Sequence, residues 1–448
     1  MVTRWLRVYA WVFAASGAVF VLGAGPLTAG LNLFAVVVPG ARPMAGAETT
    51  LWLGLTGSMM AMVAYLCWVL AVEPADETAW RTLLLSKACS TVLVAAFALV
   101  ERNPLLLIGS LTDGPIFLHL RWLRGRCRRA PRGALAPRES MLGASAYEVW
   151  FAKANDPVSG DALWVRYTLS RGPSGEEASV WWALFDRAGK TTRHGRWTEP
   201  VSALALGQAG GVFACPTGRL EPGRLRAAKD GVRWDLRWTP TTDASFRFVP
   251  AALCALGLAP TDYRTPVPAA RFDGEVEIDG RRLVLKDAPG SLGHLWGREM
   301  GKRWRWMHIV LPATAPQHDD TVCEALLAEA EVAGRTITLV MVHLLYRGEH
   351  YSTPGLLRAI RWGPLPTGPD PSKWSFTSDL GPLVVEGLCS ADPALTANVP
   401  YTCPSGRRLL CRNSKTGSMK LTLRFKDGRA PVGLAADGTA AIEAVERA

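Results

Sequence analysis

The sequence predicts an α-helical transmembrane bundle followed by an all-β region of two barrel or sandwich halves. Hydrophobic residues make up 49% of the 448 residues, and the mean hydropathy of +0.11 indicates membrane-spanning segments. The long apolar stretches all lie upstream of residue 121. After residue 145 the hydrophobic pattern alternates with a period of two residues, which is typical of strands.

Four apolar stretches in residues 1–121 are each close to the ~20 residues that a helix needs to cross the hydrocarbon core of a bilayer. The first follows Arg4 and Arg7, as a signal peptide would, but its apolar character continues to Val38, so we interpret it as an uncleaved anchor. A soluble bundle would not be apolar on all faces. The four stretches span residues 8–22, 51–72, 83–100 and 104–120.

The fourth stretch differs from the others because it carries a carboxylate, in the sequence Asp113-Gly114-Pro115. We expect the Gly-Pro pair to break the helix and to expose Asp113 to water. The alternative is a functional role for Asp113, since intramembrane carboxylates are costly and often functional.

A cluster of arginines follows the fourth stretch, whereas the loops between the other stretches hold few cations. Positive charge is retained on the cytoplasmic side, so we expect a multi-pass protein of the inner membrane with both termini and the β region in the cytoplasm. The cluster adjoins a membrane span and has no interleaved aromatic residues, which favours anionic lipid headgroups over nucleic acid as its partner. The predicted headgroup contacts are Arg121, Arg124, Arg126, Arg128 and Arg129.

Composition also predicts the domain boundaries. Residues 1–121 form the membrane domain, and residues 122–145, rich in Arg, Pro, Gly and Ala, form a basic linker. Two β domains are then expected over 146–270 and 271–448, with a joint near Pro266 and Pro268.

Strand patterns recur throughout the β region. Residues 147–153 and 163–169 alternate on either side of a turn, which predicts a hairpin. A second hairpin is predicted at Asp279-Gly280, a turn dipeptide that favours primed turns. A long strand is predicted over 336–346, whereas 251–258 is ambiguous and 326–333 fits either a short helix or a strand.

Residues 288–312 hold the candidate site. Trp304, Trp306 and His308 fall on one face of a predicted strand, and His294 and Trp296 share a face just upstream. Indole rings with a few polar groups are typical of an apolar ligand cavity. The structural alternative is that these rings are core residues, and that the Gly-His-x-Trp-Gly turn only closes the barrel.

Several stretches together resemble the lipocalin-like (calycin) superfamily of carotenoid 1,2-hydratase (hydroxyneurosporene synthase) and tocopherol cyclase. They are YEVWF with DALWVRYTL, then GVRWDLRW, then RFDGEVEIDG, then APGSLGHLWG with RWRWMHIV. The resemblance covers residues 146–440, is strongest at 272–310, and does not include the membrane domain.

The resemblance implies two lipocalin-like β domains and a cavity for an isoprenoid-type substrate. It also implies acid-initiated chemistry, in which a proton adds to a carbon–carbon double bond and water or an internal hydroxyl captures the cation. His294 and Trp296 match the family's HxW element, and the following aromatic strand matches by residue type. The hydratases also need a downstream carboxylic acid, for which Asp319, Asp320 and Glu324 lie at a suitable distance.

The predicted catalytic residues are therefore His294, His308 and Glu324. Substrate contacts are predicted at Trp296, Trp304, Trp306 and His343, although His343 also fits a satisfied core position. An acid in a dry pocket can protonate an alkene, and indole faces stabilise the resulting cation.

Other functions are also considered. A metal site at His294, His308 and His343 has no HxH or HxxxH pair to support it, so we expect neither a metal nor another cofactor. The nine cysteines contain no CxxC pair, and Cys403 and Cys411 are predicted to be two unpaired buried thiols. The alternative to an enzyme is a non-catalytic carrier of a lipophilic ligand, or a sensor that signals through the membrane domain.

Overall fold

The structure is a computed structural model. It describes residues 2–43, 46–72, 76–128, 135–138, 146–173, 175–207, 211–250, 254, 259–312, 320–332, 335–366 and 370–448. The chain forms two compact units, one of residues 1–133 with 251–256, and the other of residues 134–250 with 257–448. The first unit is helical and the second is built from strands, which confirms the predicted fold class.

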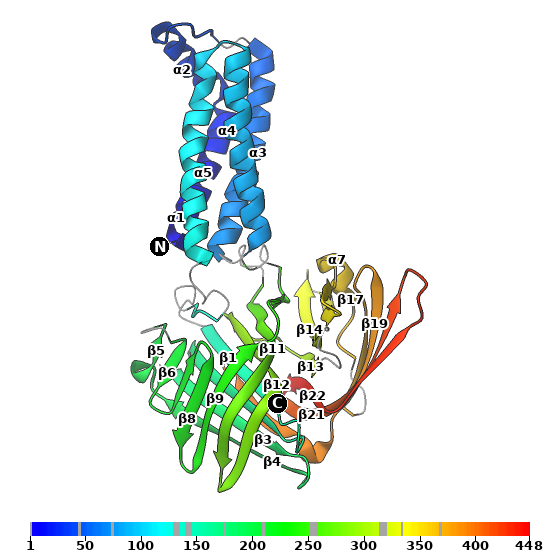
Figure 1. Ribbon diagram of the computed structural model, residues 1–448. Coiled ribbons are helices and arrows are strands. Elements are labelled where there is room, and N and C mark those ends of the chain that lie inside the picture. The colour runs from blue at the N-terminus through cyan, green and yellow to red at the C-terminus, as the bar shows by residue number, and fades with distance from the viewer. Residues whose placement is uncertain are drawn as a thin grey trace. The chain divides into compact units, whose positions relative to one another are not determined.

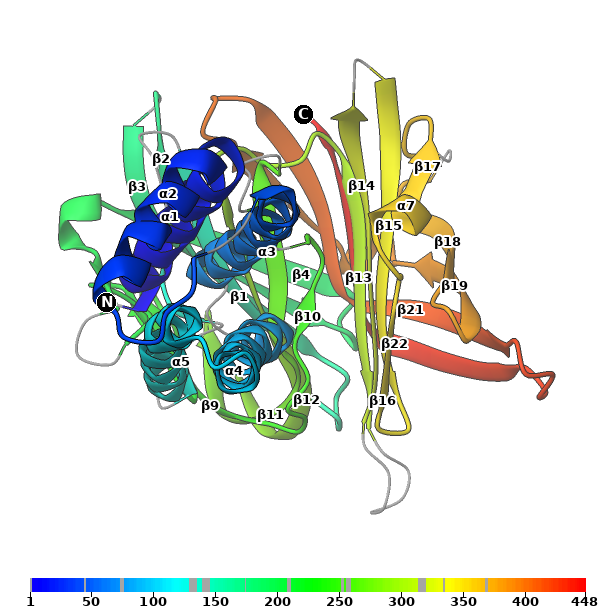
Figure 2. The same ribbon diagram turned by 90° about the horizontal axis from the view of Figure 1, so that it is seen from above.

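The helical unit is a bundle whose long helices run side by side (Figures 1 and 2). Three segments are long and apolar enough to cross a membrane: Arg4–Leu22, Leu53–Ala71 and Thr78–Val100. The apolar run that follows Leu22 forms a separate helix. The helices are α1 (Val2–Leu22), α2 (Ala24–Val37), α3 (Gly46–Val72), α4 (Glu77–Val100) and α5 (Leu107–Arg128), with a 3-10 turn η1 (Pro104–Leu106) before α5.

Helix α5 departs from the prediction in two ways. It is not among the three candidate spans of the described residues, because its last turns carry arginines. It also does not break at the Asp113-Gly-Pro sequence, since the helix continues through Pro115 to Arg128. The physical reason is a partner for the carboxylate. Lys87 Nζ on α4 donates a 2.9 Å hydrogen bond to Asp113 Oδ1, with both side chains largely buried.

The β unit contains two strongly curled sheets. The first has 12 strands, in the order β4-β3-β2-β1-β12-β11-β9-β8-β7-β6-β5, with β10 beside β11. All pairings in this sheet are antiparallel. Adjacent strands are consecutive in sequence except where β1 meets β12 and where β11 meets β9. The strands are β1 (Ala146–Asn155), β2 (Ala162–Gly172), β3 (Gly175–Asp186), β4 (Thr191–Glu199), β5 (Ala205–Leu206), β6 (Phe213–Cys215), β7 (Gly218–Glu221), β8 (Arg224–Lys229), β9 (Val232–Pro240), β10 (Phe246–Arg247), β11 (Thr261–Ile278) and β12 (Arg281–Gly297).

The second sheet has 10 strands, in the order β16-β15-β14-β13-β22-β21-β19-β18, with β17 beside β15 and β20 beside β21. The C-terminal strand β22 inserts between β13 and β21. It therefore pairs with the first strand of this sheet as well as with its own neighbour in sequence. The strands are β13 (Trp304–Leu311), β14 (Thr321–Val332), β15 (Arg335–Tyr346), β16 (Glu349–Ser352), β17 (Ile360–Trp362), β18 (Lys373–Asp379), β19 (Leu383–Ser390), β20 (Ala397–Thr402), β21 (Arg408–Phe425) and β22 (Val432–Arg447), with a short helix α7 (Leu356–Ala359).

Several local predictions can be compared with these strands. The hairpin β1–β2 and the Asp279-Gly280 hairpin are present, the latter with positive φ at both turn residues. The ambiguous segment 326–333 belongs to strand β14 as far as Val332. The chain passes from the first sheet to the second between Gly297 and Trp304. The predicted domain boundary at residue 271 lies inside strand β11 of the first sheet. The ambiguous segment 251–258 lies outside the described residues, apart from Cys254.

Three apolar layers result from the alternation of side chains. One face of the first sheet encloses a core around Trp150, Trp234 and Phe272. One face of the second sheet encloses a core around Met307 and Val342. The remaining faces of the two sheets pack against each other, and we call this third region the inter-sheet layer. It contains the buried cysteines Cys403 and Cys411, which are unpaired as predicted, together with Tyr147, Phe151, Trp164, Tyr263, Trp306, Val310 and Met341.

Candidate functional site

Three predicted residues form a row in the inter-sheet layer. Glu324 on β14 lies directly opposite His308 on β13 and directly opposite His343 on β15. Residues that oppose each other in antiparallel strands share a face, so the three side chains enter the same layer. Trp306 lies two residues before His308 and therefore joins them. This part of the predicted site is brought together by the order of the strands.

Glu324 is the most constrained member of the row. It is fully buried, and its Oε1 accepts hydrogen bonds from Tyr263 Oη, from Thr265 Oγ1 at 2.8 Å and from Trp306 Nε1 at 2.8 Å. Its other oxygen, Oε2, has no hydrogen-bond partner among the described residues. Burial raises the pKa of Glu324 to about 7 despite these donors and the nearby Lys153 charge. A large fraction of this carboxyl group therefore carries a proton at neutral pH.

His308 is a neutral imidazole. Its Nε2 donates a 2.9 Å hydrogen bond to the carbonyl oxygen of Pro268, which leaves Nδ1 as the acceptor. Nδ1 has no hydrogen-bond partner in the described part of the chain. Complete burial, assisted by the charge of Lys153, holds the pKa of His308 well below its usual value. The site thus contains a protonatable carboxyl and an unprotonated imidazole on adjacent strands, and each has a free polar atom.

Two buried lysines surround these groups. Among the described residues, Lys153 Nζ on β1 reaches three distant acceptors, each at 3.5 Å: Asn155 Oδ1 and the carbonyl oxygens of His308 and Thr439. Burial and repulsion from Lys415 lower the pKa of Lys153 to about 7. Lys415 Nζ on β21 pairs with Glu443 Oε1 at 2.8 Å and lies 4.9 Å from the centroid of the Trp306 ring.

His343 has protein partners at both ring nitrogens. Nε2 donates to the carbonyl oxygen of Arg247 at 3.0 Å, and Nδ1 accepts from His350 Nε2 at 3.1 Å. The ring stacks on Phe246 at a centroid distance of 4.9 Å. Burial, followed by the effect of His350, lowers the pKa of His343 to about 3. This is the arrangement of a satisfied core histidine, which was the structural alternative for this residue.

The structure places His294 and Trp296 on the other face of the first sheet. The His294 ring stacks on Trp150 of the first-sheet core, at a centroid distance of 5.0 Å, and its Nε2 lies 2.9 Å from Glu148 Oε1. The guanidinium groups of Arg138 and Arg264 both lie near the Trp296 ring, with Cζ atoms 5.0 and 4.7 Å from its centroid. The predicted set of one cavity is therefore divided into two groups, because β12 and β13 belong to different sheets and the His294 face of β12 points away from the inter-sheet layer, toward the first-sheet core.

The carboxylates considered at the sequence level are distinguished by their partners. Asp320 pairs with Arg271 and accepts from Thr241, each at 2.8 Å, so its charge is compensated. Asp319 lies outside the described residues. Glu324 is the one of these carboxylates that the structure places beside His308 and Trp306. Trp304 is half-buried and packs at the edge of the same layer.

Sequence reasoning missed Lys153, Tyr263, Thr265 and Lys415. One signal was available for Lys153, since it interrupts the apolar strand Val149-Trp-Phe-Ala, where an isolated charge is unusual. For Tyr263 and Thr265 no local signal exists, because both contact Glu324 only across the sheets. No three His, Cys, Asp or Glu side chains in the described ranges lie close enough together to hold a metal ion.

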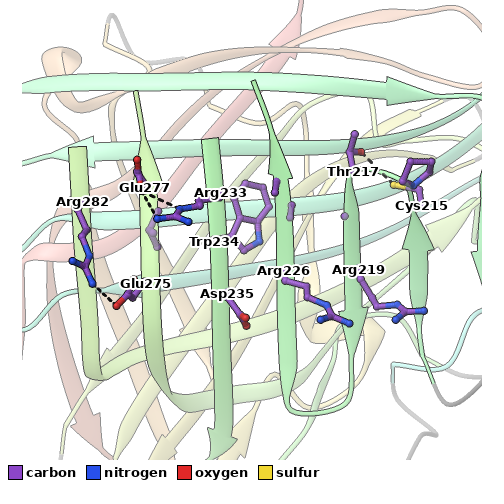
Figure 3. A pocket seen from close by; sticks show the side chains of 15 residues that line it. Cys215, Thr217, Arg219, Arg226, Arg233, Trp234, Asp235, Glu275, Glu277 and Arg282 are labelled. Atoms are coloured by element: carbon purple, nitrogen blue, oxygen red, sulfur yellow. Dashed lines mark hydrogen bonds and ion pairs between the residues drawn. The ribbon is translucent and has the colours of Figure 1, made fainter. Parts of the chain in front are cut away.

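A separate cavity of about 540 Å³ opens on strands β6–β9, β11 and β12 of the first sheet (Figure 3). Its lining includes charged side chains that pair with one another, such as Arg282 with Glu275 and Arg233 with Glu277. None of its lining residues belongs to the row of Glu324 or contacts it. We therefore place the candidate site in the inter-sheet layer, where the perturbed groups and unpartnered polar atoms lie.

The chain is similar to several known proteins. An uncharacterized protein of Mycobacterium tuberculosis, in strains H37Rv and CDC 1551, is 26% identical over 315 residues, which cover 66% of this chain and 88% of that protein. Three solved structures are also matched, each at low identity. A putative AttH of Nitrosomonas europaea has a TM-score of 0.43 at 13% identity, covering 70% of this chain and 97% of its own.

Kievitone hydratase of Nectria haematococca has a TM-score of 0.43 at 9% identity, covering 67% of this chain and 89% of its own. CghA, solved with Sch210972, has a TM-score of 0.38 at 12% identity, covering 68% and 89% respectively. The match to a family of proteins covers residues 250–445, which include β11 to β21 and most of β22, and therefore the row of Glu324. The family whose model matches this region is described as tocopherol cyclase-like, and the match covers less than half of the chain.

Proposed function

We propose that the β unit binds a lipophilic, isoprenoid-type olefin in the inter-sheet layer and catalyses its acid-initiated hydration or cyclisation. The observation that carries the proposal is Glu324, a fully buried carboxyl with one oxygen unpartnered among the described residues and a pKa raised to about 7. The tocopherol cyclase-like domain supports a hydratase or cyclase type of activity. Acid catalysis of this kind needs a protonated group in a site that excludes water.

In the proposed reaction, the Glu324 hydroxyl transfers its proton to one alkene carbon, and the π electrons form the new C–H bond. The other alkene carbon becomes a tertiary cation, which the rings of Trp306, Tyr263 and Phe151 stabilise by their negative faces. The Phe151 ring lies 5.7 Å from Trp306 and 6.4 Å from Tyr263, between centroids. Water or an internal hydroxyl then adds to the cation.

The oxygen that adds to the cation must lose a proton before the product leaves. The unpartnered Nδ1 of His308 is suited to accept it, because the ring is neutral and Nε2 already carries the hydrogen. Returning that proton to the Glu324 carboxylate restores the starting state. His308 is therefore proposed as the base, and His294, on the other face of the first sheet, as a structural residue.

The helical unit suits such a substrate, because an apolar olefin partitions into the bilayer and a tethered β unit has a short search. We propose a multi-pass protein of the inner membrane, with α5 as the fourth span and both termini in the cytoplasm. Anionic headgroups are the proposed partners of the arginines near the end of α5. Of these, Arg121, Arg124, Arg126 and Arg128 lie in α5, and Arg129 lies outside the described residues.

The function is tested by extracting lipids from the purified protein, identifying them by mass spectrometry, and incubating them with the full chain in deuterated water. Protonation of the alkene by Glu324 is expected to place one non-exchangeable deuterium on carbon in each product molecule. Both hydration and cyclisation give this label. Bound lipid that returns unchanged and unlabelled would instead establish the carrier function.

The rate of the reaction should follow the protonated fraction of Glu324. Because the pKa of Glu324 is raised to about 7, the acid form predominates below pH 7 and decreases about tenfold for each pH unit above it. We expect turnover to fall in the same way when the pH rises from 7 to 9. Initial rates in buffers of constant ionic strength measure this profile. A rate that increases above pH 7 would contradict an acid role for Glu324.

A further inference from the structure

Two buried polar side chains of the inter-sheet layer take no part in the proposed acid chemistry. They are Trp164 on β2, which is 2% exposed, and Asn413 on β21, which is fully buried. Trp164 Nε1 and both polar atoms of the Asn413 carboxamide have no hydrogen-bond partner among the described residues. A buried amide that lacks every partner destabilises the fold, so its presence indicates a group that binds there.

The position of Asn413 links it to the acid site. Asn413 lies directly opposite Glu443 on β22, and Glu443 lies directly opposite Trp306 on β13, so all three share one face. Trp164 belongs to the same layer, with Cys411 and Ala397, the latter being the residue opposite Asn413 on β20. The Lys415 ammonium lies between the two indoles, 5.8 Å from the Trp164 centroid and 4.9 Å from the Trp306 centroid.

The distance between the two ends of this region limits the size of a ligand. Asn413 and Glu324 lie on strands β21 and β14, which are separated by β22 and β13. Neighbouring strands are about 4.8 Å apart, so the carboxamide and the carboxyl lie roughly 15 Å apart along the sheet. A chain of about three isoprene units reaches from one to the other, at about 5 Å for each four-carbon repeat.

The charge of the region indicates which polar group fits. The Lys415 ammonium is compensated by Glu443 at 2.8 Å, and Glu443 is itself mostly buried. An additional anion would therefore disrupt a buried ion pair rather than find a free cation. Among the described residues, Trp164 and Asn413 contribute two unpartnered donors, Trp164 Nε1 and Asn413 Nδ2, and one unpartnered acceptor, Asn413 Oδ1.

We propose that Asn413 and Trp164 form a polar subsite that binds an uncharged hydroxyl or carbonyl oxygen of the substrate, at the opposite end from the alkene that Glu324 protonates. This proposal rests on the binding half of the proposed function and not on its catalytic half. The subsite makes the preferred ligand an oxygenated, electrically neutral isoprenoid. A pure hydrocarbon would leave the Asn413 carboxamide without a hydrogen bond, and a ligand carboxylate would be repelled by the Glu443 carboxylate.

The test compares three probes of the same chain length: farnesol, β-farnesene and farnesoic acid. Their binding to the purified full chain in lipid nanodiscs is followed by tryptophan fluorescence. We expect the wild type to bind farnesol about 5- to 30-fold more tightly than β-farnesene, since a site built to hydrogen-bond an oxygen rejects an analogue that lacks it. Farnesoic acid should bind more weakly than farnesol.

Asn413→Leu keeps the size of the side chain and is expected to reduce the ratio between farnesol and β-farnesene to about 1 by weakening farnesol alone. Trp164→Phe removes the indole N–H and also makes the ring smaller, and it should reduce the ratio about two- to fivefold. This variant tests the subsite if Asn413→Leu does not fold. Glu324→Gln serves as the matched control, because it should leave the ratio unchanged even if it abolishes turnover.

Several results would overturn the subsite. They are a wild type without preference for the alcohol, an acid that binds more tightly than the alcohol, or an Asn413→Leu variant that weakens both neutral probes equally. The last of these would mean that the carboxamide does not contact the oxygen of the ligand. An intact alcohol preference in a protein that adds no deuterium would retain the subsite and reject the catalytic proposal, so the two failures are distinguishable.

Discussion

Glu324→Gln is expected to lower the turnover number by about 10²- to 10⁴-fold, the range attributed to a positioned general acid. The amide has the shape of the carboxyl group and can still accept hydrogen bonds from Thr265 and Trp306 through its oxygen, so the site should keep its structure. The amide cannot donate a proton to carbon. Initial rates of deuterium incorporation into the extracted lipid measure the loss.

His294→Gln is the matched control for this prediction. The same residue is introduced, but His294 stacks on Trp150 on the other face of the first sheet. We expect its turnover to stay within about tenfold of the wild type, with any loss explained by lower stability after the Glu148 hydrogen bond is changed. If His294→Gln abolished turnover and Glu324→Gln did not, the reaction would have to take place in the interior of the first sheet and not in the inter-sheet layer.

Lys87→Ala is expected to destabilise the helical unit by about 3–5 kcal/mol, the cost of breaking a buried ion pair by removing one partner. The Lys87 ammonium pairs with Asp113 at 2.9 Å and lies 4.4 Å from the Phe13 ring centroid, so it connects α4 with α5 and α1. Without it, the Asp113 carboxylate is largely buried and uncompensated. Thermal unfolding of the full chain in detergent measures the change.

The double variant Lys87→Ala with Asp113→Ala provides the control for this prediction. It removes both charges together, so its stability should recover most of the loss, as is found when buried ion pairs are replaced as a unit. If the single and double variants lose the same stability, then packing around Lys87 explains the effect and the ion pair does not hold α5 to α4.

The fold class was predictable because its two signals, long apolar stretches and two-residue alternation, are local properties of the chain. Long apolar stretches marked the helical unit, and alternation over residues such as 163–169 and 336–346 marked strands that the structure contains. The break in helix α5 was predicted wrongly for a corresponding reason. Local chemistry at Asp113-Gly-Pro favours a break, and the compensating charge of Lys87 lies 26 residues away in the chain.

The candidate site was predictable only in part. Alternation placed Trp304, Trp306 and His308 on one face, and that face enters the inter-sheet layer, where we place the candidate site. The same rule correctly paired His294 with Trp296. The rule could not relate the first group of residues to the second. The two-residue period fixes the faces within one strand, but it gives no information about which sheet the next strand joins.

The sequence by itself determined the helical and β regions and the faces of the aromatic strand, and its family resemblance offered three carboxylates as candidates for the acid. Only the tertiary structure decided that Glu324 is the one beside His308, that Tyr263, Thr265 and Lys153 surround it, and that Asn413 lies on the same face. The physical reason is that a side chain's face depends on its own strand, whereas its burial and its raised pKa depend on the atoms that distant strands pack around it.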